Sequence, residues 1–142
     1  MTDEADIARD LREALRPIWR RLASANTISV GKMGILAYLK EHGRATAAAL
    51  AVAEHVSAQA VATSVRELEE AGYVVRTRDD VDRRRVWIDV TPAGKERLER
   101  ERALGQEWLV DAMTTTLDAG ERNLVAAAVP ALRKLGQHAS AG

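Results

Sequence analysis

The chain has 142 residues, 46% of them hydrophobic and 30% charged, and its 21 basic and 21 acidic side chains cancel to a formal net charge of zero. This length suits one hydrophobic core and is short for two independent domains, so we expect a single domain over residues 1–142. The sequence has no cysteine for disulfide or thiol chemistry, no run near the ~18 apolar residues of a membrane span and no signal-peptide pattern, which favours a cytoplasmic protein.

Apolar side chains recur at helical spacing in the N-terminal part of the chain. They predict a helix over residues 6–25, which Pro17 should kink because proline removes a backbone hydrogen bond and crowds the preceding turn. A second helix is predicted over residues 29–42, with Ser29 as its N-cap and Gly43 at its end.

Two shorter helices follow, separated by a tight turn. Thr46 is a suitable N-cap for the first and Ser57 for the second, and Gly72 supplies the left-handed residue that commonly closes a helix. The inward stripe of the second helix consists of Val61, Val65 and Leu68. The side chains predicted to point away from the core are Gln59, Ala62, Thr63 and Arg66.

Two short strands joined by an arginine-rich tip come next. In the second, Val86, Ile88 and Val90 alternate with Trp87 and Asp89, the period of a half-buried strand. The order of helix, turn, helix and basic hairpin predicts a winged helix-turn-helix, which can grip two adjacent grooves of DNA. Zero net charge requires the positive charge to be concentrated on one face. The candidate cluster is Arg66, Arg76, Arg78, Arg83, Arg84 and Arg85, and the alternative is a solvated hairpin tip.

The C-terminal part is predicted to be helical. Thr91 and Pro92 mark the start of a long helix that ends near residue 115. Asp118 and Glu121 have the spacing of a capping box for a last helix over about residues 119–135. Pro130 lies inside that helix and should bend or divide it. Residues 138–142 are expected to form a frayed tail.

These residues resemble the MarR-type winged-helix transcriptional regulators over almost the whole chain. The most specific part is a D-x-R wing, Asp82 to Arg84, followed by a short strand and a T-x-x-G sequence, Thr91 to Gly94. Two positions depart from that pattern. The turn residue that is often Gly is His55 here, and histidine tolerates a positive φ better than most residues. The residue after the second wing arginine, often Ser, is Arg85.

The resemblance implies a fold that is mainly α with a small β-wing, a winged helix-turn-helix over residues 29–91 flanked by dimerisation helices over residues 6–25 and 92–137. It implies a homodimeric transcriptional regulator, with repression as the commoner mode. The apolar stripes of the terminal helices agree, since they supply more apolar surface than one small winged helix can cover. The alternative is that these helices pack within the monomer.

In such a dimer, two recognition helices would enter successive major grooves of a pseudo-palindromic operator in double-stranded DNA. Gln59 can pair with adenine, and Ala60 or Thr63 can contact a thymine methyl group; the alternative for Gln59 and Thr63 is exposed helix surface. The residues suited to phosphate contacts are Thr46, Ser57 and Ser64, and Arg66 could serve either role.

In the wing, Arg84 is expected to enter the minor groove, where narrow A·T-rich tracts concentrate negative potential. Asp82 would orient this arginine through a charge-assisted hydrogen bond. Arg83 and Arg85 are expected to meet phosphates.

Such regulators often respond to small aromatic or amphipathic ligands. The residues that could line a pocket are Trp19, Met33, Tyr38 and Trp108, with Arg20 or Lys32 to meet an anion. The alternative is that these residues form core, because aromatic and methionine residues at helical spacing are more often core than ligand contacts. No cofactor is expected, and the scattered histidines disfavour a metal site.

Two other functions compete with DNA reading. An enzyme would need a nucleophile with a base, paired acids in a cleft or a phosphate loop, and no such constellation is visible. A winged-helix module that binds proteins and does not read DNA gains some support from zero net charge and from the acidic residues Glu67, Glu69 and Glu70. A steep loss of binding with added salt would distinguish DNA reading from protein binding.

Overall fold

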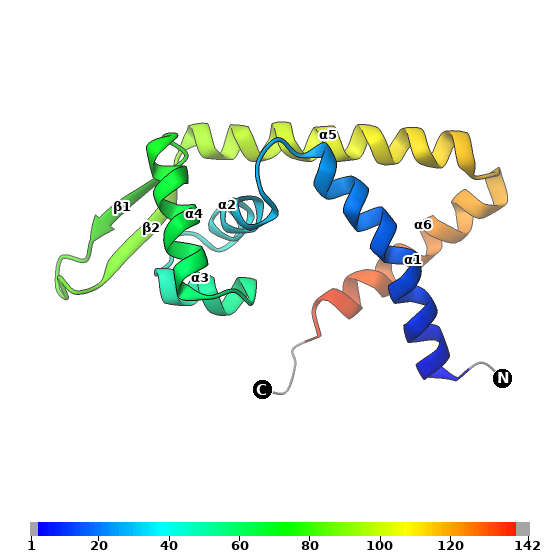
Figure 1. The fold of residues 1–142 in the computed structure, drawn as a ribbon, viewed down its shortest axis with the longest axis horizontal. Coiled ribbons are helices and arrows are strands. Elements are labelled where there is room, and N and C mark those ends of the chain that lie inside the picture. Colours follow the sequence, from blue (N-terminus) through cyan, green and yellow to red (C-terminus); the bar gives the residue numbers. More distant parts are fainter. Residues whose placement is uncertain (1–2, 139–142) are drawn as a thin grey trace. The chain divides into compact units, whose positions relative to one another are not determined.

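The computed structural model describes residues 3–138, six helices and a two-stranded antiparallel sheet (Figure 1). The chain divides into two compact units, Met1–Gly105 and Gln106–Gly142. The elements are, in chain order, α1 (Glu4–Ala25), α2 (Val30–His42), α3 (Ala47–Glu54), α4 (Ala58–Glu70), β1 (Val74–Arg78), β2 (Val86–Val90), α5 (Pro92–Thr116) and α6 (Ala119–Gly136). The expected fold class, mainly α with a small β-wing, is confirmed.

The helix starts agree with the predicted caps. The side chains of Ser29, Thr46 and Ser57 each accept a hydrogen bond from the backbone N–H three residues further on, at 3.1–3.2 Å. At the start of α6, Asp118 and Glu121 form the predicted capping box, with bonds of 2.8 and 3.0 Å. Each cap satisfies an amide that has no partner within its own helix.

Pro17 and Pro130 lie inside uninterrupted helices. Helix α1 continues through Pro17, and α6 runs as one helix through Pro130. A division of the last helix at Pro130 was therefore wrong: the ring removes a single backbone hydrogen bond, and the neighbouring turns keep theirs. The kink expected at Pro17 and the bend expected at Pro130 stay predictions, and residues 139–142 of the expected tail lie outside the described residues.

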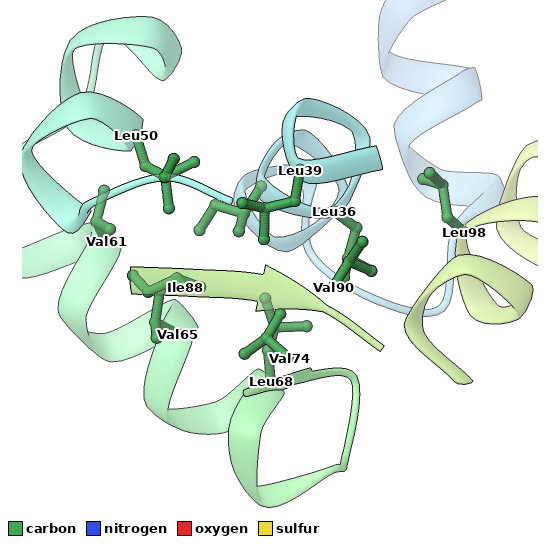
Figure 2. Close-up of a cluster of buried hydrophobic side chains, with 12 residues drawn as sticks. Leu36, Leu39, Leu50, Val61, Val65, Leu68, Val74, Ile88, Val90 and Leu98 are labelled. Carbon is green, nitrogen blue, oxygen red and sulfur yellow. The ribbon is translucent and has the colours of Figure 1, made fainter. Parts of the chain in front are cut away.

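The core of the first unit is built from α2, α3, α4, both strands and the start of α5. Figure 2 shows the side chains of α2, α3, α4 and the strands gathered together, with Leu98 of α5 to one side of them. The predicted inward stripe of α4 is confirmed, since Val61, Val65 and Leu68 are at most 3% exposed. The remaining buried hydrophobic residues are Ile35, Leu36, Leu39, Ala45, Leu50, Val74, Ile88, Val90 and Leu98.

The strands pair with Val74 opposite Val90 and Arg78 opposite Val86. A short segment before α3 adds to this sheet: the N–H of Ala45 donates to the carbonyl of Ile88 at 3.0 Å, and the N–H of Ile88 donates back at 2.8 Å. No pattern in the sequence predicted this bridge. It fixes the backbone beside Arg44 against the base of the wing.

Two turns depend on left-handed backbone. His55, between α3 and α4, has φ 54° and ψ 42°, so the turn expected there forms without glycine. Gly72, in the turn that follows α4, has φ 82°.

The junction between the wing and α5 requires a glycine for a different reason. The hydroxyl of Thr91 donates to the carbonyl of Gly72 at 2.7 Å and accepts from the N–H of Gly94 at 3.0 Å. A Cβ added at Gly94 would lie 2.8 Å from Cγ2 of Val90 and closer still to the carbonyl oxygen of Tyr73. The T-x-x-G sequence is thus explained by the close approach of the first turn of α5 to this backbone.

Helices α1 and α6 contain no buried residue. Each carries large apolar side chains that are open to solvent in this chain. On α1 these are Ile7, Leu15, Ile18 and Trp19, and on α6 they are Leu124, Val125, Val129, Leu132 and Leu135.

Candidate nucleic-acid interface

The exposed face of α4 lies opposite its buried stripe. Gln59, Ala62 and Arg66 are exposed on this face, and Thr63 beside them is half-buried. These are the side chains that the helical spacing predicted to point away from the core. They lie within residues 59–66 of this helix and present one amide, one hydroxyl and one guanidinium.

The hydroxyl groups assigned to phosphates differ in their surroundings. The oxygens of Thr46 and Ser57 cap α3 and α4, which leaves each O–H free to donate to an anion. Ser64 and Ala60 instead line a small cavity between α4 and α2. Their DNA contacts stay predictions, and this geometry favours those of Thr46 and Ser57.

The wing holds Arg84 through Asp82. Oδ1 of Asp82 accepts from Nε of Arg84 at 3.2 Å and from its backbone N–H at 3.1 Å, so the expected ion pair is present. The Arg84 side chain is 94% exposed. The pair therefore orients a guanidinium that projects into solvent.

Asp79 organises the turn of the wing, a role that the sequence did not suggest. Its Oδ2 accepts the N–H groups of Val81 and Asp82 at 3.2 and 2.8 Å, and its Oδ1 accepts the indole N–H of Trp87 at 3.0 Å. The hydrogen bond from Asp82, followed by that from Trp87, lowers the pKa of the Asp79 carboxyl below its ordinary value. The one indication of this role in the sequence is that aspartate in a turn tends to accept hydrogen bonds from backbone N–H groups two or three residues ahead.

Two arginines lie over the Trp87 ring. The guanidinium carbon of Arg44 is 4.4 Å from the ring centroid and that of Arg85 is 5.5 Å from it. Cation–π attraction thus restrains both side chains on the wing. Sequence reasoning missed Arg44, because it precedes α3 and reaches the wing only through the bridge at Ala45. The phosphate contact of Arg85 stays a prediction.

Two of the three acidic residues toward the end of α4 are paired with cations. Glu67 forms an ion pair with Lys32 of 2.6 Å, and Glu69 receives three bonds of 2.6–3.1 Å from Arg76. Those hydrogen bonds lower the pKa of both carboxyls. Arg78 donates to the carbonyl of Arg83 at 3.2 Å. Arg76, one of the arginines in the expected cationic cluster, therefore neutralises the charge of Glu69.

A buried carboxylate on α5, which the sequence did not suggest, ties the loop before α2 to this helix. Glu101 is 1% exposed and accepts bonds from the backbone N–H of Thr27 at 2.6 Å, from the Thr27 hydroxyl and from Nε of Arg97 at 2.9 Å. Arg97 also donates to the Tyr73 hydroxyl at 2.9 Å. Burial acts to raise the pKa of Glu101, but the bonds from Thr27 and the ion pair with Arg97 outweigh it and lower that pKa.

The residues expected to line a ligand pocket are dispersed among several surroundings. Trp19 and Arg20 line two different grooves along α1. Met33 and Tyr38 pack partly buried against the core, and Lys32 is bound to Glu67. Trp108 belongs to the second unit. Their ligand role stays a prediction.

None of the helices within residues 3–138 combines the length and apolar character that crossing a membrane requires.

Residues 27–85, which contain the helix-turn-helix and the wing, match the model of the MarR family. The chain is 30% identical to an uncharacterised HTH-type transcriptional regulator of Mycobacterium leprae over 88% of this chain and 89% of that protein. The chain belongs to the MarR family. Its relatives in this family are transcriptional regulators and not enzymes, so the chain is a MarR-type transcriptional regulator that binds DNA.

Solved structures agree with this membership. The crystal structure of a candidate transcriptional regulator from Pseudomonas aeruginosa has 30% sequence identity and a TM-score of 0.81, and the match covers 96% of this chain and 97% of that one. The MarR fold is also shared with BpsR of Bordetella bronchiseptica, at 20% identity and a TM-score of 0.64, over 90% of this chain and 99% of that one. The structure of BpsR concerns regulation of its DNA binding by 6-hydroxynicotinic acid.

Proposed function

We propose that this MarR-family protein is a cytoplasmic homodimeric repressor that binds a pseudo-palindromic operator and is released by a small amphipathic ligand. The observation that carries the proposal is the pairing of a solvent-facing recognition surface on α4 with a wing arginine oriented by Asp82. A helix and a wing of this kind suit the major groove and the adjacent minor groove.

In this proposal the contacts divide by chemistry. Gln59 pairs with adenine and Thr63 or Ala60 contacts a thymine methyl group, while Arg84 enters the minor groove. The contacts to phosphate come from Thr46, Ser57, Ser64, Arg66, Arg83 and Arg85. Gln59 and Thr63 would set specificity, and the phosphate contacts would set affinity and its dependence on salt.

A homodimer is supported by the apolar faces of the terminal helices. Trp19 is 61% exposed on α1, and Leu124 is 71% exposed on α6. Amphipathic helices bury such faces against another element, and large open apolar patches mark association sites. A second copy that covers them would also place two recognition helices on one operator, as a pseudo-palindrome requires.

Release by a ligand is supported by precedent in the same fold, since BpsR is regulated by an aromatic acid. In this chain Trp19, Arg20, Lys32, Met33, Tyr38 and Trp108 are the proposed contacts. The alternative of a protein-binding module is not favoured, because Glu67 and Glu69, two of the acids that supported it, are paired with Lys32 and Arg76.

The test is selection of genomic DNA fragments by the purified protein, by Arg84→Ala and by Arg100→Ala. Arg100 is a matched control: it is an exposed arginine on α5, paired with Glu96 at 3.1 Å. We expect one pseudo-palindromic site that the wild type and Arg100→Ala recover and Arg84→Ala loses. If a folded dimer enriches no DNA fragment, the result would favour a protein-binding role, or a ligand-occupied form that has already released DNA.

A further inference from the structure

A cavity of about 150 Å³ lies against α4 and is not used by the ligand residues proposed above. Its walls are mostly apolar and come from α2, α3 and α4. The lining residues that matter here are Val30, Gly31, Ile35, Glu54, Val61 and Ser64. Two polar groups therefore face an otherwise hydrocarbon space: one carboxylate and one hydroxyl.

Two glycines of α2 lie beside this site: Gly31 lines the cavity, and Gly34 lies next to Glu54. A Cβ built at Gly31 would meet Oγ of Ser64 at 3.7 Å, an ordinary contact across the space. A Cβ built at Gly34 would lie 2.8 Å from Cδ of Glu54. The Glu54 carboxyl thus lies against the backbone of α2, at the edge of the cavity.

The charge of Glu54 has no cationic partner within residues 3–138. No lysine, arginine or histidine nitrogen in that range lies within 4.0 Å of its carboxylate. Lys32, on the same part of α2, is held by Glu67 at 2.6 Å. A carboxylate beside apolar walls costs desolvation free energy unless a cation or a hydrogen-bond donor meets it.

We propose that this cavity binds a small organic cation, an ammonium group on a compact apolar body. The ammonium would bind the Glu54 carboxylate, with the Ser64 hydroxyl as a second acceptor, and the apolar body would lie against Val30, Ile35 and Val61. A cavity of about 150 Å³ accommodates a body about the size of benzene. This chemistry is opposite in charge to the anion that Arg20 or Lys32 would meet.

Occupancy would act on DNA binding through α4. Val61 and Ser64 lie on the same helix as Gln59 and Thr63, so a ligand that contacts the first pair shifts the helix that carries the second. This part of the inference rests on the proposed function. By linkage, a ligand that weakens operator binding must itself bind less tightly to the operator complex.

The first experiment needs no DNA. Thermal unfolding and calorimetric titration of the full chain are measured with benzylamine, benzyl alcohol and benzoate, which share one ring and differ in charge. We expect benzylamine alone to stabilise the protein, with a Kd on the order of 0.1–1 mM for a ligand of this size. Glu54→Gln should weaken it at least roughly tenfold, the loss expected for one charged hydrogen bond.

Gly31→Ala is the second variant, since its methyl group enters the cavity at an ordinary contact distance and alanine favours the helix. It should remain folded and bind benzylamine more weakly than the wild type. Equal binding of all three compounds, no binding at all, or benzylamine binding unchanged in both variants would each overturn the site.

The second experiment adds the operator recovered by the DNA selection. Benzylamine should weaken operator binding by the wild type, and Glu54→Gln should lose most of that effect relative to its own affinity without ligand. Benzylamine binding that depends on Glu54 yet leaves operator affinity unchanged would overturn the regulatory half alone. Failure to recover any operator would count against the proposed function and leave the outcome of the first experiment intact.

Discussion

Among residues 3–138, Glu101 is the buried charged side chain, and its replacement by glutamine tests whether its network stabilises the fold. Glutamine keeps the shape of the side chain but carries no charge. Its amide has one acceptor oxygen where the carboxylate has two. Its NH₂ group must therefore face either the N–H of Thr27 or Nε of Arg97, and both of these are donors.

The size of the effect follows from the hydrogen bonds that glutamine cannot accept. A hydrogen bond to a charged group contributes about 1.5–3 kcal/mol to stability. Water reaches Thr27, which is exposed, and Arg97, whose side chain is 21% exposed, so both donors are partly resolvated in the variant. We therefore expect Glu101→Gln to lower the free energy of unfolding by about 2 kcal/mol, toward the lower part of this range.

Urea unfolding followed by circular dichroism measures this loss, at one fixed protein concentration because dimerisation would couple stability to concentration. Glu99→Gln is the matched control on the same helix. Glu99 forms an exposed pair with Lys40 at 3.2 Å, with its side chain 69% exposed. Its loss should change stability by less than about 0.5 kcal/mol.

Acid should remove the difference between the wild type and Glu101→Gln. The pKa of Glu101 is lower in the folded protein than its unfolded value of about 4.3. The stabilising contribution of its charge is then complete above the unfolded pKa and is lost as pH falls through the folded pKa. Equal stability of the two proteins at neutral pH, or a difference that grows below pH ~4, would refute this account of the network.

Three further predictions concern backbone geometry and DNA contacts. Gly94→Ala should lower the free energy of unfolding in urea by about 1–3 kcal/mol, because its methyl group meets backbone. Gly105→Ala is the control and should be tolerated, since its methyl group would lie 3.4 Å from a leucine methyl group. Equal effects of the two substitutions would contradict this explanation of the junction. His55→Gly should leave stability unchanged or raise it by about 0.5 kcal/mol and His55→Val should lower it, since φ is 54°; a harmless valine would argue against the left-handed turn. Arg83→Ala should reduce the slope of log K for DNA binding against log salt concentration by about 1 on every DNA sequence. Gln59→Ala should instead relax specificity at one base pair. Both are measured by titrations on altered sites at several salt concentrations; a specificity change in Arg83→Ala and a salt-slope change in Gln59→Ala would contradict these roles.

The features that could be predicted from the sequence are those with local causes. A cap at Ser57 or Asp118 depends on residues within one turn, and the turn at His55 depends on one φ angle. The alternation of Val86, Ile88 and Val90 likewise fixes which face of β2 is buried. Each of these appears in the structure where the spacing predicted it.

The features that the sequence did not reveal join distant residues. Thr27 meets Glu101 across 74 positions, and no spacing rule connects a loop threonine with a glutamate in the middle of a charged helix. Arg44 reaches Trp87 only because Ala45 bridges to Ile88. Conversely, Pro130 does not divide α6, because the turns on either side of the one lost hydrogen bond hold the helix together; the bend expected at Pro130 stays a prediction.

The tip of the wing separates residues that hold its shape from residues that face outward. Asp79 and Asp82 fasten the loop from inside, through backbone amides, the Trp87 indole and the Arg84 side chain. Asp80 and Val81, which lie between these two aspartates, and Arg83, which follows them, are exposed, Val81 by 94%. Under the proposed function, substitutions at these outward positions should change the affinity for DNA, while Asp79 and Asp82 keep the shape of the loop.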